Sequence, residues 1–131
     1  VAQHSIACAK EAEARGLSCE IVLGCLLHDA SEAYLSDVTR PVKELLPQYL
    51  EAEERLQALI WEHFIWRPLS DEEKKTVFKI DDSMLSMEFH LLMPEDVNEE
   101  YRELKAQVTC EFEAPEKVRN EFLGFIDRYG R

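Results

Sequence analysis

The sequence predicts an all-α fold, a single compact bundle of five to six helices that spans residues 1–131 as one domain. Leu, Glu, Ala, Lys and Arg dominate the composition, and these residues favour helices. The chain contains only four glycines and five prolines, whereas the many turns of a sandwich or barrel consume both residue types. A length of 131 residues suits one domain with a buried core.

The first two helices are predicted from their caps and their apolar pattern. The first should run from about Ala2 to Ala14 and stop at Gly16, a natural C-terminal cap. Ser18 can cap the second helix, which continues through the apolar residues 21–27. Because a helix that is apolar on every side belongs in the middle of a domain, we expect this one to be central.

Proline and serine mark the later helices. Pro41 and Pro47 each suit a helix start, and an amphipathic pattern from about Gln48 to Trp66 predicts a long helix. Ser70 and Glu73 form a capping box.

The helix that this capping box opens should end at Pro94. The acidic segment of residues 98–112 is ambiguous, and we expect a helix or an ordered loop there. Pro115 should begin the last helix.

The charge and cysteine pattern exclude several classes of function. A formal net charge of −12 disfavours nucleic-acid polymers and acidic membranes, although a small phosphate can still bind where a metal or local arginines reverse the sign. No stretch is long and apolar enough to cross a bilayer. No CxxC pair is present, so we expect the four cysteines to be free thiols of a cytoplasmic protein: Cys8, Cys19, Cys25 and Cys110.

The predicted end of the central helix carries polar residues that are unfavourable to bury. The apolar run leads directly into His28 and Asp29, with Glu32 one turn later. One solution is a hydrogen-bonded pair or a histidine at the helix terminus, and this suffices for an isolated His-Asp dipeptide. The other solution is a metal ion, for which imidazole and carboxylate are natural ligands.

Further polar residues favour the metal. His4 lies near the start of the first amphipathic helix. Asp81 and Asp82 lie between apolar residues in the helix after the capping box, and carboxylates are seldom fully buried without a partner. Asp37 follows the His-Asp dipeptide in a loop, next to basic residues.

Together, His4, the His28-Asp29 dipeptide and Asp81 resemble the H…HD…D signature of the HD-domain metal-dependent phosphohydrolase superfamily. The stretch LHDASEAYLSD over residues 27–37 is similar to the branch that contains bacterial 5′-deoxynucleotidases. The resemblance implies the HD-domain fold and one divalent transition metal (Mn, Co, Fe, Ni or Zn) with four protein ligands: His4, His28, Asp29 and Asp81. Asp82 is an alternative to Asp81.

The resemblance also implies roles for two carboxylates. The position of Glu32 is associated with proton transfer to or from the attacking water, and that of Asp37 with the catalytic water or the substrate. A carboxylate near that water can act as a general base. Glu32 would face the same side as His28 and Asp29 if the helix continues.

The expected activity is release of phosphate from a small phosphorylated substrate, specifically a nucleoside 5′-monophosphate, by attack of a metal-activated water. Arg40 and Lys43 are candidates to neutralise the substrate phosphate, although a solvated cluster at a helix start explains them equally well. Ala33 stands where guanosine polyphosphate hydrolases carry an acidic residue, which argues against that substrate.

Alternatives remain open at this stage. One is a catalytically silent HD-fold protein that binds a metal or a nucleotide in a regulatory role, and another is a metal-free helical interaction domain. Relatives often form homodimers, and the helix near Trp61 offers an interface. They usually carry an upstream segment that helps to build the pocket, and because this sequence starts three residues before His4, the identity of the substrate stays open.

Overall fold

The computed structural model describes residues 1–93 and 104–130, and within these ranges it contains helices and no strand. Five helices are long and two have four residues each: α1 (Ala2–Ala14), α2 (Cys19–Leu26), α3 (Glu32–Leu35), α4 (Arg40–Lys43), α5 (Pro47–Ile65), α6 (Asp71–Leu92) and α7 (Pro115–Tyr129). The predicted all-α class is confirmed. The described part of the chain contains more helices than the expected five to six, because the segment after the His-Asp dipeptide forms α3 in addition to the short helix α4 that Pro41 marks.

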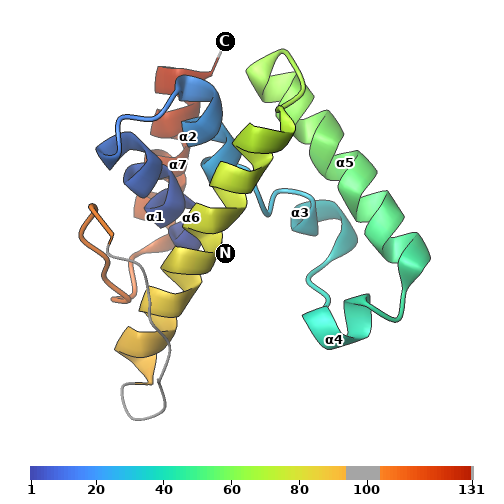
Figure 1. Cartoon of the computed structure of the whole chain (residues 1–131). Coiled ribbons are helices and arrows are strands. Elements are labelled where there is room, and N and C mark those ends of the chain that lie inside the picture. Colours follow the sequence, from blue (N-terminus) through green and yellow to red (C-terminus); the bar gives the residue numbers. More distant parts are fainter. Residues whose placement is uncertain (94–103, 131) are drawn as a thin grey trace.

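Helix α2 lies at the centre of the molecule, as its apolar sequence predicts. It contacts α1, α5, α6 and α7. In Figure 1, α6 runs diagonally across the bundle made with α1, α2 and α7, whereas α5 diverges from α6 and α3 lies between these two long helices. Four α2 side chains are at most 2% exposed: Val22, Leu23, Cys25 and Leu26.

Gly24 lets α2 approach α6 closely. A Cβ atom at this position would lie 2.9 Å from Cγ2 of Val77 and 3.2 Å from Cδ1 of Leu69. The Gly24 carbonyl also accepts a hydrogen bond of 3.2 Å from Nε1 of Trp61. Trp61 is only 4% exposed, so its side chain belongs to the core.

The predicted helix ends are confirmed where a local cap determines them. Gly16, with φ of 69°, takes the left-handed conformation just after α1. Ser18 Oγ accepts a hydrogen bond from the Ile21 amide at the start of α2. At α6, the Ser70 amide donates to Glu73 Oε2 and the Glu73 amide donates to Ser70 Oγ, which completes the capping box.

The region between α6 and α7 is only partly described. Pro94, which was expected to close α6, and residues 98–103 of the ambiguous acidic segment lie outside the described residues. Residues 104–112 form no helix. They are attached to α1 by the buried carboxylate of Glu11, which accepts hydrogen bonds from the amides of Lys105 and Ala106.

None of the described helices is both long enough and apolar enough to span a lipid bilayer.

Candidate metal centre

The His-Asp dipeptide lies in a turn rather than on a continuing helix. Helix α2 ends at Leu26, and the residues that follow form hydrogen bonds of the i to i−3 type, including Glu32 N to Asp29 O. The condition that the helix continues, under which Glu32 would face the same side as His28 and Asp29, is therefore not met. Glu32 instead begins the separate helix α3.

A side chain from α5 explains why the helix is interrupted there. Gln57 Nε2 donates to the Leu27 carbonyl over 2.7 Å, and Gln57 Oε1 accepts from the Ser31 amide over 3.2 Å. Gln57 is only 7% exposed, so these bonds satisfy backbone groups that a continuous helix would otherwise have paired. Gln57 thereby fixes the turn at Leu27 and at Ser31, and His28 and Asp29 lie between these two residues.

His28 presents a buried nitrogen toward the carboxylates. Its Nδ1 donates to the Cys25 carbonyl over 2.7 Å, which leaves Nε2 as the nitrogen that can act as a ligand. Oδ2 of Asp29 and Oδ1 of Asp81 lie 3.2 and 3.3 Å from Nε2. Nevertheless, within the described part of the chain this buried atom makes no hydrogen bond. An unsatisfied buried nitrogen beside two carboxylates fits a bound cation.

His4 joins the same cluster from α1. Its Nε2 lies 2.9 Å from Oδ1 of Asp81, and its Nδ1 lies 2.8 Å from Oε2 of Glu88. Asp81 and Glu88 are seven residues apart on α6, so both point from one face of that helix. The ring centroids of His4 and His28 are 5.3 Å apart.

The electrostatics of the cluster favour positive charge. Burial opposes the charged form of His4, but hydrogen bonds, led by that with Asp81, outweigh it and raise its pKa to about 12. Burial also opposes charge on His28, yet Asp29 and Asp81 raise the pKa of this imidazole to about 10. Although burial acts in the other direction, the two histidines hold the pKa of Asp81 well below its usual range. A divalent cation would supply the same positive charge that protons supply here.

Ligand atoms of four side chains lie within 4.8 Å of one another: His4, Cys8, His28 and Asp81. This group could hold a metal ion, and it contains three of the four predicted ligands. Asp29, whose side chain is 33% exposed, lies beside His28 at the edge of the group. Asp81, rather than its neighbour Asp82, lies between the two histidines, whereas Asp82 is exposed.

The cluster opens into a cleft of about 760 Å³ that α3, α4, α5 and α6 line together with the His-Asp turn. His28, Asp29, Asp81 and Asp82 contribute to its wall. A cleft of this size suits a small-molecule ligand.

The two predicted basic residues, Arg40 and Lys43, both line this cleft, but of the two only Lys43 forms an ion pair within the described residues. Lys43 Nζ lies 2.6 Å from Oε1 of Glu53, so its charge is already paired. Arg40 is exposed.

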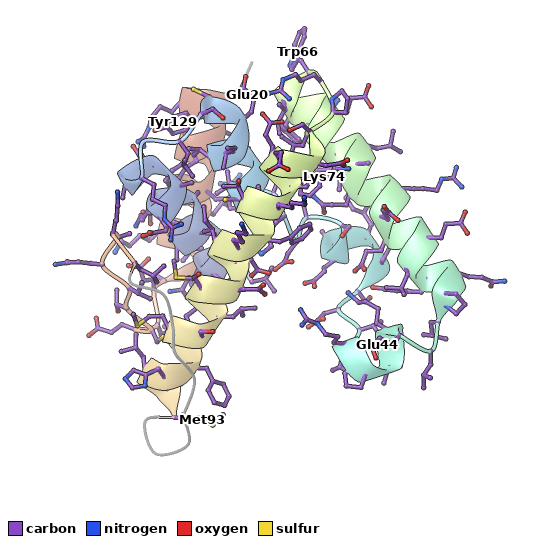
Figure 2. All side chains as sticks on the ribbon, viewed as in Figure 1. Glu20, Glu44, Trp66, Lys74, Met93 and Tyr129 are labelled. Atoms are coloured by element: carbon purple, nitrogen blue, oxygen red, sulfur yellow. The ribbon has the colours of Figure 1, made fainter. Side chains whose placement is uncertain are left out.

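Lys74 is a third basic residue of the cleft that the sequence analysis missed. Figure 2 shows Lys74 on the side of α6 that faces α5. Over residues 1–93 and 104–130, neither Arg40 nor Lys74 has an ion-pair partner.

Of the two predicted catalytic carboxylates, Glu32 lines the cleft and Asp37 does not. Glu32 lines the cleft and also a neighbouring apolar hollow of about 510 Å³, whereas Asp37 lines only the apolar hollow. Burial, together with the nearby charges of Asp29 and Asp37, raises the pKa of Glu32. The structure thus brings Glu32 to the cleft and leaves Asp37 exposed beside it.

One curated protein with similarity to the chain is uncharacterized protein YfdR of Escherichia coli (strain K12), which is 39% identical over 64 residues. The match covers 49% of this chain, and the chain spans 33% of that relative's length. That protein is itself uncharacterized, so the similarity brings no function with it. No protein-family model and no solved structure matches the chain.

Proposed function

We propose that this protein is a metal-dependent phosphohydrolase of the HD-domain type that releases phosphate from a small phosphorylated substrate, a nucleoside 5′-monophosphate. The observation that carries the proposal is the buried, unsatisfied Nε2 atom of His28. It lies with Asp81 where a cluster of side chains that could hold a metal ion meets a cleft whose wall includes basic residues.

The donor set supports a divalent transition metal. Two imidazole nitrogens and the carboxylates of Asp29 and Asp81 are the ligand types that Mn, Co, Fe, Ni and Zn accept. His4 and His28 each engage their second nitrogen, with Glu88 and with the Cys25 carbonyl, which is how ligating histidines are usually oriented. When bound, such an ion lowers the pKa of a coordinated water and polarises a phosphoryl oxygen.

The remaining residues of the cleft would bind the substrate and move protons. Lys74 and Arg40 carry positive charge into a cleft that is otherwise rich in carboxylates, so a substrate phosphate would bind between them and the cluster. Glu32 lies at the edge of the cleft beside Asp29 and would accept the proton of the attacking water. Burial that raises the pKa of Glu32 makes it a stronger base than an exposed carboxylate.

An apolar surface within the cleft supports a nucleotide over a simpler phosphate ester. Phe78 is 47% exposed and lines the cleft, with its ring centroid 6.3 Å from that of Trp61. A nucleobase is flat and apolar on its faces, so it would pack against the exposed Phe78 ring.

A second candidate is a regulatory protein of the same fold that binds a metal or nucleotide without turnover. The observation in its favour is that two predicted functional residues are not available to a substrate in the cleft. Lys43 is paired with Glu53, and Asp37 lines only the neighbouring hollow.

The experiment that separates the two candidates is phosphate release from a panel of nucleoside monophosphates with Mn²⁺, Co²⁺ or Mg²⁺ present. We expect release by the native protein and a loss of about 100-fold or more in Glu32→Gln. Glu54→Gln is the matched control, because Glu54 lines the same cleft from α5. Binding of a metal and a nucleotide without any phosphate release would favour the regulatory candidate.

A further inference from the structure

We infer that Cys8 is a fourth donor of the metal centre, so that the site binds a sulfur-seeking ion such as Zn²⁺ or Co²⁺ through His4, Cys8, His28 and Asp81. The inference rests on the metal-binding part of the proposed function and assigns to it a ligand beyond the predicted imidazoles and carboxylates.

The position of Cys8 on α1 brings its sulfur to the cluster. Cys8 lies four residues after His4, so both side chains extend from one face of α1. Cys8 is 1% exposed, and its Sγ lies 3.6 Å from Nε2 of His4. Its Sγ is among the four ligand atoms that lie within 4.8 Å of one another.

Two of the separations in the cluster match those expected around a tetrahedral ion. With Zn–N near 2.05 Å and Zn–S near 2.3 Å, ligand atoms should be about 3.3 Å apart for two nitrogens and about 3.6 Å apart for nitrogen and sulfur. The distance from His4 Nε2 to Cys8 Sγ is 3.6 Å, and that from His28 Nε2 to Asp81 Oδ1 is 3.3 Å. The 2.9 Å between His4 Nε2 and Asp81 Oδ1 would lengthen by a few tenths of an ångström.

A second observation, independent of the thiol, points to a ligand at the same place. The side chain of His28 is 2% exposed, and its Nε2 is directed into the cluster without a hydrogen-bond partner among the described residues. Cys8 is therefore not a solitary buried thiol. It lies in the same group as the buried Nε2 atom of His28, which has no hydrogen-bond partner among the described residues.

Coordination by Cys8 would also determine how open the site is. As the sulfur–metal bond forms, the thiol loses its proton to solvent. Four protein ligands would match the tetrahedral preference of zinc, and the water of the proposed function would then bind as a fifth ligand, a coordination number that catalytic zinc can reach. Asp29 lies outside the four-atom group, so an ion that prefers oxygen would instead use Asp29 and leave Cys8 protonated.

Cobalt provides a direct readout, because a cobalt–thiolate bond gives near-ultraviolet charge-transfer absorption that nitrogen and oxygen ligands do not give. We would titrate the native protein with Co²⁺ and record its absorption spectrum beside those of Cys8→Ser and Cys25→Ser. Cys25 is the matched control, since it is fully buried in α2 and lies outside the four-atom group. We expect the band in the native protein and in Cys25→Ser, and its loss in Cys8→Ser with cobalt still bound.

A complementary variant removes the dependence on how well Cys8→Ser folds. A protein in which Cys19, Cys25 and Cys110 are all serine retains Cys8 as its one thiol. We expect this variant to keep the band.

Bound cobalt without a charge-transfer band in the native protein would overturn the role of Cys8 and leave the proposed phosphohydrolase site standing. A band that persists in Cys8→Ser would overturn it equally. If the native protein bound no cobalt at all, both this inference and the metal centre of the proposed function would fall.

Discussion

Nδ1 of His4 lies 2.8 Å from Oε2 of Glu88, on the opposite side of the imidazole from Asp81. The two carboxylates lie seven residues, or about two turns, apart on one face of α6 and hold the ring between them. Asp81 meets the nitrogen that would bind a metal, and Glu88 accepts a hydrogen bond from the N–H of the other nitrogen. This pairing orients the His4 ring and would increase its strength as a ligand for the proposed metal.

Replacing Glu88 should weaken metal binding without removing a ligand. We expect Glu88→Gln to lower the affinity for Zn²⁺ or Co²⁺ by about 10-fold or more, because the neutral amide is a weaker acceptor for the His4 N–H. Competition with a coloured chelator measures this affinity. Glu72→Gln, an exposed change on the same helix, is the control. Equal affinities in Glu88→Gln and the native protein would contradict the role of Glu88.

Gln57 should stabilise the turn that carries the His-Asp dipeptide. In Gln57→Leu, the Ser31 amide loses its partner and the Leu27 carbonyl keeps only the bond from the Ala30 amide, so we expect a loss of about 2 kcal/mol in the free energy of unfolding. Urea denaturation measures the change. Gln48→Leu is the control, because Gln48 is exposed at the start of the same helix. A stability loss no larger in Gln57→Leu than in Gln48→Leu would contradict this account.

The capping box of α6 should make stability depend on pH. The bidentate contact with Arg67, together with the Ser70 amide, lowers the pKa of Glu73 to about 2 from 4.5, even though partial burial acts in the other direction. Because the folded-state pKa is depressed, this contribution is fully present above pH 4.5 and is lost as the pH falls toward 2.

Denaturation of the native protein and of Glu73→Gln across that pH range tests this relationship. We expect the native protein to lose stability more steeply with falling pH than the variant does. Glu72→Gln, which changes the preceding residue, should keep the native slope. Identical slopes in the native protein and in Glu73→Gln would show that Glu73 does not contribute to the pH dependence.

Lys74 should contribute to substrate binding in the cleft. Because a hydrogen bond to a charged phosphate contributes on the order of 1.5–3 kcal/mol, we expect Lys74→Met to lower kcat/KM for phosphate release by about 10- to 100-fold. Lys75→Met is a closely matched control, since Lys75 is the next residue of α6, is exposed and pairs with Glu72. An unchanged kcat/KM in Lys74→Met would remove Lys74 from the proposed site.

The sequence predicted the fold well where local chemistry determines it. The glycine after α1, the serine before α2, the capping box of α6 and Pro115 at the start of α7 each mark a helix end in the structure. Each of these signals depends on backbone conformation or on a hydrogen bond within a few residues. The interruption after Leu26 was not predictable in this way, because the amide that replaces the helical bonds belongs to Gln57, which is 30 residues from Leu27.

The candidate site was predicted in part. Helical spacing could have indicated the residues that were missed, since Cys8 lies four residues after His4, and Lys74 and Glu88 each lie seven residues from Asp81. The pairing of Lys43 with Glu53 could not be predicted, because it depends on how α4 packs against α5. Whether the predicted ligands bind a metal stays a prediction.

The most direct test of the central claim is elemental analysis of the purified protein beside Asp81→Ala and Asp82→Ala. Both changes remove a carboxylate from adjacent positions of α6, but only Asp81 lies between His4 and His28. We predict about one transition-metal ion per chain in the native protein and in Asp82→Ala, and very little in Asp81→Ala. A native protein without metal, or equal metal in all three proteins, would contradict the account.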